Sequence, residues 1–474
     1  MSNPKVGLIT FGDPREHEWK NIFSRMGIPR HKQAIEFLQS LPLELYYSDE
    51  IARTMADIDK QVEVLKKTGV EVFIAHNPCW AWPNLVVRGV LGMDLPTVLL
   101  ANANPGTHAT VGLLGAGGAL DQIGKAHLRI RADFDDLQTH LFTDKMLPYI
   151  RAASAVARLK GKVFGMFGGR SLGIDTGTFD PMQWKAQFGV DADHIDQLEI
   201  ISGAEKIKPE RTEKMVKWLT DNMKSITYNE ILTAEKLAYQ VRCYLATKDI
   251  IAERNLDFVS IKCMPELTNN YVPQCLSAAF LPGPYDADGT KEPVAMSCEA
   301  DADAALTMEI LSLISGNAPT IFADVSHIEP ELKAIYLPNC GGMCSWFANR
   351  SSDPKENLKQ IEIRPANRPA GGGVTYLIAA PGEITLARLY RKAGKYHMAI
   401  IEGEVIKLGQ EKYEEFVKAR GTHQLPTAFV KADIDFERFV DEYAANHIVG
   451  VAGHYTKELK HVCEFLNIVP DVMS

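Results

Sequence analysis

Short apolar segments alternate with helix-length amphipathic segments through the first two thirds of the chain, and this alternation restricts the fold more than any other feature. The strand-like segments are 5–10, 71–76, 97–102, 161–169, 197–202, 257–262, 293–298 and 320–325. Helical patterns such as residues 50–69 separate them. Strands and helices in alternation are typical of parallel sheets covered by helices.

The pattern changes beyond residue 350. The β-rich segments there are 373–380, 384–391 and 396–406. Glycine and proline turns separate them, which is typical of an antiparallel sheet or barrel. A final amphipathic helix is expected within 456–468. We therefore predict an α/β protein with two doubly wound, Rossmann-like parallel-sheet domains, residues 1–160 and 161–350, followed by a C-terminal antiparallel β-barrel-like domain, residues 351–474.

Composition excludes several classes of protein. A hydrophobic fraction of 46% over 474 residues excludes general disorder. A net charge of −9 without a basic block argues against nucleic-acid binding. The sequence contains neither a membrane-length apolar run nor an N-terminal secretion signal, so we expect a cytoplasmic protein. Its eight cysteines lack zinc-site spacing and are expected to be free thiols.

Two carboxylates each follow a strand-like run in the segment 293–324. Glu299 follows VAMSC and Asp324 follows TIFA, and a helical pattern between them ends near Gly316. Strand, helix and strand in that length predict a right-handed βαβ unit with parallel strands. Both carboxylates are then expected at the carboxyl edge of the sheet, where ligands of open α/β sheets bind.

Two interpretations of this carboxylate pair are open. The side chains can bind a hard or borderline divalent cation, or act as acid and base. Alternatively, Glu299 is an acid favoured by a helix N-terminus, and Asp324 caps a turn. Asp301 and Asp303 are interpreted as acids at the start of the helix.

Histidine supplies a candidate nitrogen donor. Asn446 and His447 precede an apolar, glycine-containing run, and His454 follows it. A neutral imidazole with two carboxylates makes a mixed nitrogen and oxygen site suited to Mn²⁺ or a related ion, with positions left for substrate oxygens. A structural role for the histidine is the alternative.

Two loops follow strand-like runs at the same kind of sheet edge. Trp80 follows the run 71–76, and its ring can stack on the apolar face of a sugar or anchor an interface. Arg170 follows the run 161–169 within a glycine-rich turn, where it can meet an anion or a hydroxyl-rich ligand.

Together these residues resemble the L-fucose/L-arabinose isomerase family of metal-dependent ketol isomerases, in its broad and less characterised branch. The segment from Cys298-Glu299 to Ala323-Asp324 is similar to the family segment that carries two metal-binding carboxylates, with one residue more between them. The pair Asn446-His447 resembles the family's Asn-His pair, whose histidine is the third ligand. This favours His447 over His454.

The resemblance implies Mn²⁺, or another divalent metal, bound by Glu299, Asp324 and His447, with both carboxylates also carrying protons. It implies a sugar pocket lined by Arg15, Trp80, Arg170, Leu172, Lys262, Asn339 and Asn446. Arg15 and Trp80 lie in loops that in this family reach a neighbouring subunit, so a homotrimer or homohexamer with shared active sites is expected. Lys262 replaces a family glutamine, Leu172 replaces a methionine, and the turn Asn339-Cys340-Gly341-Gly342 replaces one that contains serine.

The resemblance therefore predicts an aldose–ketose isomerase that works through a cis-enediol. The family acts on L-fucose, D-arabinose and L-arabinose. However, Arg15, Arg170 and Lys262 are more cations than a neutral sugar needs, so an anionic hexose such as sulfoquinovose, with its 6-sulfonate, is an alternative substrate. Each cation can instead pair with an acid. A non-catalytic sugar-binding protein on the same scaffold is the competing hypothesis.

Overall fold

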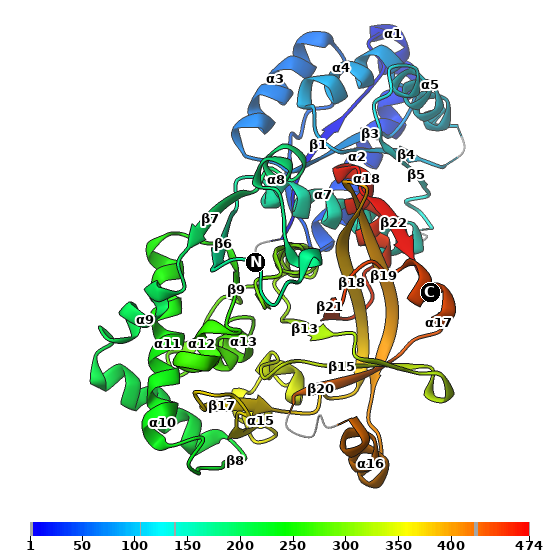
Figure 1. Ribbon diagram of the computed structural model, residues 1–474. Coiled ribbons are helices and arrows are strands. Elements are labelled where there is room, and N and C mark those ends of the chain that lie inside the picture. Colours follow the sequence, from blue (N-terminus) through cyan, green and yellow to red (C-terminus); the bar gives the residue numbers. More distant parts are fainter. Residues whose placement is uncertain (1–2, 105, 137–138, 421–424, 474) are drawn as a thin grey trace. The chain divides into compact units, whose positions relative to one another are not determined.

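The computed structural model describes residues 3–104, 106–136, 139–420 and 425–473 (Figure 1). The chain divides into two compact units, Met1–Ala157 and Arg158–Ser474. Each unit has its own sheets and its own core.

The first unit contains a five-stranded parallel sheet with strand order β2-β1-β3-β4-β5. Its strands are β1 (Lys5–Thr10), β2 (Glu44–Tyr47), β3 (Val72–Asn77), β4 (Thr97–Asn102) and β5 (Leu128–Ala132). The strands predicted at 5–10, 71–76 and 97–102 are confirmed. The strand order reverses between β1 and β3, and the carboxyl ends of strands at such a reversal form the usual ligand crevice of this topology.

Helices cover both faces of this sheet. The helices of this part of the chain are α1 (Glu16–Glu18), α2 (Ser24–Ser40), α3 (Met55–Lys67), α4 (Pro83–Met93), α5 (Ala109–Gln122), α6 (Thr139–Leu141) and α7 (Leu147–Leu159), with π-helical turns at Trp19–Phe23 and Phe142–Met146. Apolar side chains of α3, α4 and α5 pack on one face in a core that includes Ile9 and Phe73. On the other face, His31 of α2 lies 2.8 Å from the hydroxyl of Thr10.

The second unit contains a four-stranded parallel sheet with strand order β12-β9-β6-β7. Its strands are β6 (Val163–Phe167), β7 (Asp191–Ile195), β9 (Phe258–Ile261) and β12 (Met296–Cys298). The order reverses between β6 and β9, so a second ligand crevice is expected there. The strand predicted at 197–202 is wrong: this segment lies in helix α9 (Leu198–Ala204), which buries Ile200, Ile201 and Ala204 at helical spacing.

An eight-stranded sheet follows, and its members are joined almost entirely by antiparallel pairs. Its order is β13-β21-β18-β19-β20-β15-β14, with β22 paired in parallel to β19. The strands are β13 (Thr320–Asp324), β14 (His327–Glu329), β15 (Ala334–Pro338), β18 (Gly382–Lys392), β19 (Lys395–Ile406), β20 (Thr427–Lys431), β21 (His447–Ala452) and β22 (Val469–Val472). Figure 1 shows β18 and β19 as a long hairpin. β13 and β14 stand at the two ends of this path and, among the described residues, do not pair with each other, so the predicted barrel is an open sheet.

Helix α14 (Ala302–Ile314) lies between the parallel and the antiparallel sheet. Every one of its 13 residues is buried, and it contacts β9 and β12 of the parallel sheet as well as β13, β18 and β21 of the antiparallel sheet. A helix that is buried all round needs apolar surface on more than one side. The antiparallel sheet therefore buries a face against α14, and the parallel sheet contacts the same helix.

The same helix corrects the predicted βαβ unit. β12 and β13 flank α14 in the chain, but they belong to different sheets, and β13 runs antiparallel to β21. The chain enters α14 from the parallel sheet and leaves it into the antiparallel one. The antiparallel sheet thus includes β13, β14 and β15, which precede residue 350.

The remaining elements surround these sheets. The helices are α8 (Pro181–Gln187), α10 (Pro209–Asn222), α11 (Ala234–Glu253), α12 (Glu266–Asn270), α13 (Cys275–Phe280), α15 (Pro354–Leu358), α16 (Gln410–Arg420), α17 (Phe436–Glu442) and α18 (Thr456–Leu466). Two small sheets join β8 (Ser225–Ile226), β16 (Glu362–Pro365) and β17 (Gly373–Tyr376), and β10 (Tyr285–Asp286) with β11 (Gly289–Thr290). The predicted C-terminal helix is confirmed as α18, which contacts β19. No helix in the described part of the chain has the length and apolarity to cross a membrane.

A buried ion pair ties α14 to the parallel sheet, and breaking it is expected to destabilise the second unit. Nζ of Lys162 lies 3.0 Å from Oε1 of Glu309 and 3.0 Å from Oδ1 of Asp257. Burial raises the pKa of Glu309, and Lys162 opposes that rise. We expect Lys162→Met to lower the free energy of unfolding by roughly 3–5 kcal/mol, because it leaves a buried charge without a partner.

Urea unfolding followed by circular dichroism measures this effect. The neighbouring exposed lysine supplies the control, and Lys160→Met should change the free energy of unfolding by less than about 0.5 kcal/mol. Adding Glu309→Gln to Lys162→Met should recover much of the loss. Equal stability of Lys162→Met and the wild type would contradict this account of α14.

Candidate active site

The pairing of β13 with β21 brings two of the predicted ligands together. Asp324 is the last residue of β13 and His447 is the first residue of β21, and the two are direct partners in the antiparallel register. Opposed residues of an antiparallel pair point to the same face of the sheet and have neighbouring side chains. Oδ1 of Asp324 accordingly lies 3.3 Å from Nε2 of His447.

Glu299, the third predicted ligand, lies in a constrained turn directly after strand β12 of the parallel sheet. Glu299 follows the last residue of β12, and both Glu299 and Ala300 have left-handed backbones, with φ of 59° and 56°. Such conformations cost of order 1–3 kcal/mol each in residues other than glycine and concentrate at functional sites. The turn brings Oε2 of Glu299 to 3.6 Å from Nε2 of His447.

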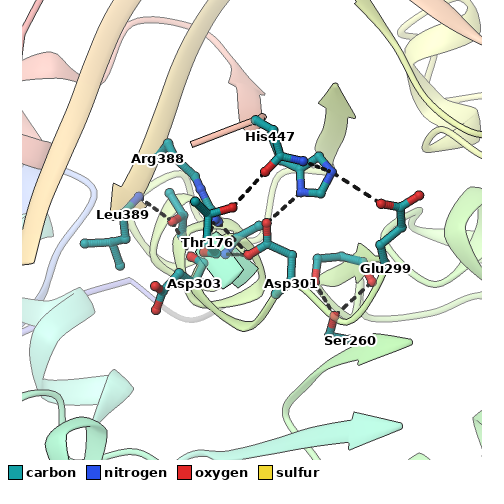
Figure 2. Close-up of polar contacts among 12 residues, drawn as sticks. Thr176, Ser260, Glu299, Asp301, Asp303, Arg388, Leu389 and His447 are labelled. Atoms are coloured by element: carbon teal, nitrogen blue, oxygen red, sulfur yellow. Dashed lines mark hydrogen bonds and ion pairs between the residues drawn. The ribbon is translucent and has the colours of Figure 1, made fainter. Parts of the chain in front are cut away.

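Figure 2 shows His447 between Glu299 on one side and Asp301 on the other. Nδ1 of His447 lies 2.7 Å from Oδ2 of Asp301. A carboxylate only accepts hydrogen bonds, so Nδ1 carries a proton toward Asp301, and without a metal Nε2 also carries a proton, toward Asp324 and Glu299. A metal bound at Nε2 would take the place of that second proton. Burial opposes protonation of the imidazole, but hydrogen bonds with Asp301, Asp324 and Glu299 outweigh it and raise the pKa of His447 well above its usual value.

Asp301 forms an ion pair with a buried arginine. Arg388 of β18 is fully buried, with Nη1 2.9 Å from Oδ1 of Asp301 and Nη2 donating to the carbonyl of Thr176 at 3.0 Å. Burial favours the neutral acid, but the charge of Arg388 and the hydrogen bond with His447 hold the pKa of Asp301 below its usual value. Asp301 also accepts a hydrogen bond from the backbone N–H of Ala304, as the predicted helix-start acid should.

Sequence reasoning did not single out Arg388 or the contact between Asp301 and His447. One signal was available: Arg388 stands among leucines and alanines of a strand-like run, and a charge on a buried strand requires an acidic partner. Because Arg388, Asp301 and His447 are far apart in the sequence, the sequence does not indicate which acid pairs with Arg388.

Asp303 makes contacts that are separate from those of Asp301. It is buried, accepts a hydrogen bond from Tyr396 at 2.9 Å, and lies 3.3 Å from Nε of Arg391. Burial raises its pKa to about 6, against the opposing charges of Arg388 and Arg391. Asp303 therefore shares its helix turn with Asp301 but faces Tyr396 and Arg391.

Three predicted substrate residues follow the strands at the reversal point of the parallel sheet. Arg170 and Leu172 follow β6, and Lys262 follows β9. The loops touch: the hydroxyl of Ser171 donates to the carbonyl of Met264 at 2.9 Å. Gly168 has φ of 89°, and a Cβ there would lie 2.9 Å from Cβ of Lys262, so glycine permits this close approach.

The cations of these loops have acidic partners. Arg170 pairs with Asp175, and Nζ of Lys262 lies 2.6 Å from Oε1 of Glu266. Leu172 is unusual in another way, because it is 56% exposed and has a left-handed backbone with φ of 49°. An exposed leucine held in such a conformation is a candidate for contact with a ligand.

The two predicted asparagines differ in what their amides do. Asn446 contacts the site directly: Nδ2 lies 3.0 Å from Nε2 of His447, and Oδ1 accepts from the hydroxyl of Thr176 at 2.8 Å. Asn339 is buried and holds its own turn, because Oδ1 accepts from the backbone N–H groups of Gly341 and Gly342 at 3.1 Å each.

Arg15 and Trp80 lie in the first unit, in the loops that follow β1 and β3 at its reversal point. The guanidinium of Arg15 pairs with buried Asp13 at 2.6 Å, and Trp80 packs beside Trp19 and Cys79. The other histidine candidate has a different setting from His447. His454 lies 3.3 Å from Glu383 and 3.5 Å from Glu402, and is 46% exposed.

The donor set fits a divalent cation. Among the described residues no group of three or more His, Cys, Asp or Glu side chains is arranged to hold a metal ion, so the fit rests on the chemistry of the donors. Instead, two carboxylates face Nε2 of one imidazole whose other nitrogen is held by Asp301. A carboxylate behind a histidine that presents Nε2 is the usual support of a metal-ligating histidine. A cation between Glu299, Asp324 and His447 would replace the imidazole proton as the charge that these acids share.

Two models of known protein families match the chain. Residues 3–161 match the model of the L-fucose isomerase first N-terminal domain, and residues 337–474 match that of the L-fucose isomerase C-terminal domain. Together the two matches cover more than half of the chain. The chain belongs to the L-fucose isomerase family. It is an enzyme of the aldose–ketose isomerase type, so the hypothesis of a non-catalytic sugar-binding protein is not retained.

Individual relatives are distant. A sulfoquinovose isomerase of Alkalicoccus urumqiensis is 24% identical over 67% of this chain and 66% of its own length. An L-fucose isomerase of Streptococcus pneumoniae serotype 4 is 21% identical over 99% of this chain and 93% of its own. A periplasmic solute-binding protein of Actinobacillus succinogenes with bound D-allose covers 56% of this chain and 82% of its own, at 12% identity and a TM-score of 0.17, a likeness that carries no argument.

Proposed function

We propose that this isomerase depends on a divalent metal, Mn²⁺ or a related ion, held by Glu299, Asp324 and His447. The observation that carries the proposal is that both carboxylates approach the same nitrogen, Nε2 of His447, from two different sheets. Two acids beside one imidazole supply the mixed nitrogen and oxygen donors that such an ion prefers.

Proton transfer falls to the two carboxylates. One of them takes the proton from C2 of the open-chain aldose while O1 gains a proton, which gives a cis-enediol. The other then helps to return a proton at C1 as the hydroxyl proton leaves O2, which gives the 2-ketose. Asp324 is 37% exposed and can meet substrate, whereas Glu299 is 8% exposed. When bound, the metal supplies Lewis-acid polarisation of the carbonyl and lowers the pKa of the neighbouring hydroxyl. Asp301 keeps His447 in the tautomer that presents Nε2.

Two sugar classes are candidates, each with an observation in its favour. Relatives named sulfoquinovose isomerase favour an anionic hexose with a 6-sulfonate. The pairing of Arg15, Arg170 and Lys262 with acids leaves less free positive charge than the sequence suggested and favours a neutral sugar such as L-fucose or an arabinose. Arg368 is a further cation near the site, and Nη2 donates to the carbonyl of Cys340 at 3.3 Å.

We also propose a homotrimer or homohexamer in which Arg15 and Trp80 of one subunit complete a neighbour's pocket. Both residues sit where the strand order of the first unit reverses, which supports a ligand-binding role. Glu299, Asp324 and His447 all belong to the second unit.

Metal removal and a sugar panel test the proposal together. The purified protein is assayed with L-fucose, D-arabinose, L-arabinose and sulfoquinovose, after EDTA treatment and after Mn²⁺ is restored. We expect EDTA to abolish isomerisation and Mn²⁺ to recover it. Mn²⁺ should also stabilise the fold, by about 2.7 kcal/mol at a free concentration of about 100 Kd. Full activity in EDTA would overturn the metal proposal, and preference for one sugar decides between the substrate classes.

A further inference from the structure

Four of the eight cysteines gather beside the candidate active site. Cys263 follows β9, Cys275 begins α13, Cys298 ends β12, and Cys340 lies in the turn after β15. All eight cysteines are free thiols, and Cys340 is the one that is partly exposed; every cysteine lies in the described part of the chain. The proposed function uses none of these thiols.

The closest thiol contact joins the two large sheets of the second unit. Sγ of Cys298 lies 3.3 Å from Sγ of Cys340, and Cys298 also makes a hydrogen bond with Cys263. A disulfide needs about 2.05 Å between sulfurs, so bond formation requires an approach of roughly 1.2 Å. That movement is small enough for side-chain rotation and a slight backbone shift.

The turn that carries Cys340 is closely packed and well anchored. Asn339 holds the N–H groups of Gly341 and Gly342, and a Cβ at Gly341 would lie 2.4 Å from Sγ of Cys275. Because this turn cannot yield easily, a crosslink would draw Cys298 toward it. Cys298 directly precedes Glu299, whose left-handed backbone sets the direction of the carboxylate.

We propose that Cys298 and Cys340 are a redox-active dithiol that a small hydroperoxide oxidises to a disulfide, and that this crosslink reversibly inactivates the site by displacing Glu299. The inactivation, but not the crosslink, rests on the proposed function. Cys340 reacts first because it is the partly exposed thiol of the pair.

The chemistry balances with hydrogen peroxide as oxidant. The sulfur of Cys340, after losing its proton, attacks one peroxide oxygen; the O–O bond breaks, and the departing hydroxide takes up a proton to become water. Cys340 is then a sulfenic acid. The sulfur of Cys298 attacks the sulfenic sulfur, the S–O bond breaks, and the oxygen leaves as a second water. Two thiols lose two electrons and two protons, and the peroxide is reduced to two waters.

The experiment treats the reduced full-length protein with hydrogen peroxide, blocks the remaining thiols under denaturing conditions, and maps peptides by mass spectrometry. We expect a peptide pair linked through Cys298 and Cys340, and a dithiothreitol-reversible loss of at least tenfold in isomerase activity. Cys298→Ser and Cys340→Ser should each abolish the linked pair and the peroxide-dependent loss. Cys344→Ala is the matched control, because this buried thiol is four residues from Cys340 and should leave the linkage intact.

The two readouts separate the failure of this proposal from the failure of the proposed function. Absence of the linked pair in the wild type, or a crosslinked protein as active as the reduced one, would overturn the dithiol switch. A linked pair in a protein that isomerises none of the sugars would uphold the dithiol and overturn the proposed function. If Cys298→Ser does not fold, Cys340→Ser provides the same comparison.

Discussion

Glu299→Gln and Asp324→Asn are each expected to lower turnover by roughly 10²–10⁴-fold, the range that a positioned acid or base contributes. Each change keeps the size of the side chain but removes the charge that faces Nε2 of His447 and the capacity to carry a proton. Steady-state rates on the best sugar of the panel, with saturating Mn²⁺, measure the loss. Circular dichroism and the midpoint of thermal unfolding should stay close to those of the wild type.

A second histidine with two acidic neighbours supplies the control for this experiment. Glu402→Gln removes a carboxylate 3.5 Å from His454, which is the other ligand candidate. We expect this variant to retain turnover within about twofold. Near-normal activity of Glu299→Gln or Asp324→Asn would refute the assignment, and a large loss in Glu402→Gln would move the site toward His454.

Asp301→Asn is expected to weaken Mn²⁺ binding and activity by roughly 10–100-fold, the usual effect of removing the carboxylate behind a metal-ligating histidine. Oδ1 of Asp301 already accepts a hydrogen bond from the N–H of Ala304 and pairs with the guanidinium of Arg388, while Oδ2 contacts Nδ1 of His447. The introduced amide NH₂ would therefore face Nδ1, and this favours the tautomer with a proton on Nε2. Isothermal titration with Mn²⁺ measures the effect directly.

Asp303→Asn separates positioning of His447 from general loss of the buried charges. Asp303 lies on the same turn of α14 but contacts Tyr396 and Arg391. Its replacement should leave the Mn²⁺ affinity within a few-fold, and excess Mn²⁺ should restore turnover in Asp301→Asn. If both variants bind Mn²⁺ equally poorly, or if excess metal rescues neither, Asp301 does not act through His447.

Local patterns predicted much of this fold. The strands at 5–10 and 97–102 were found within their predicted limits because each is a continuous β-rich run in a parallel sheet buried on both faces. The strand prediction for 197–202 was wrong because the pattern there is ambiguous. A short run with adjacent isoleucines fits a strand as well as one face of a helix, and the segment lies in α9.

The candidate site, too, was predicted only in part from the sequence. The run before each carboxylate, the Asn-His pair and the family resemblance drew attention to Glu299, Asp324 and His447, and the structure brings these side chains together. The reason given for their proximity was wrong, since β12 and β13 lie in different sheets. Strand pairing between Asp324 and His447 joins residues far apart in the chain, and no local pattern records such a register.

The alternation of strand and helix and the change beyond residue 350 followed from the sequence, because hydrophobic periodicity acts over a few neighbouring residues. The family likewise could be recognised from the chain alone. Only the tertiary structure showed that α14 is buried between two sheets, that the antiparallel sheet stays open, and that Arg388 and Asp301 stand behind His447. These features depend on which surfaces meet after the chain collapses. The free energy of those contacts comes from segments far apart in the chain, so no single segment determines it.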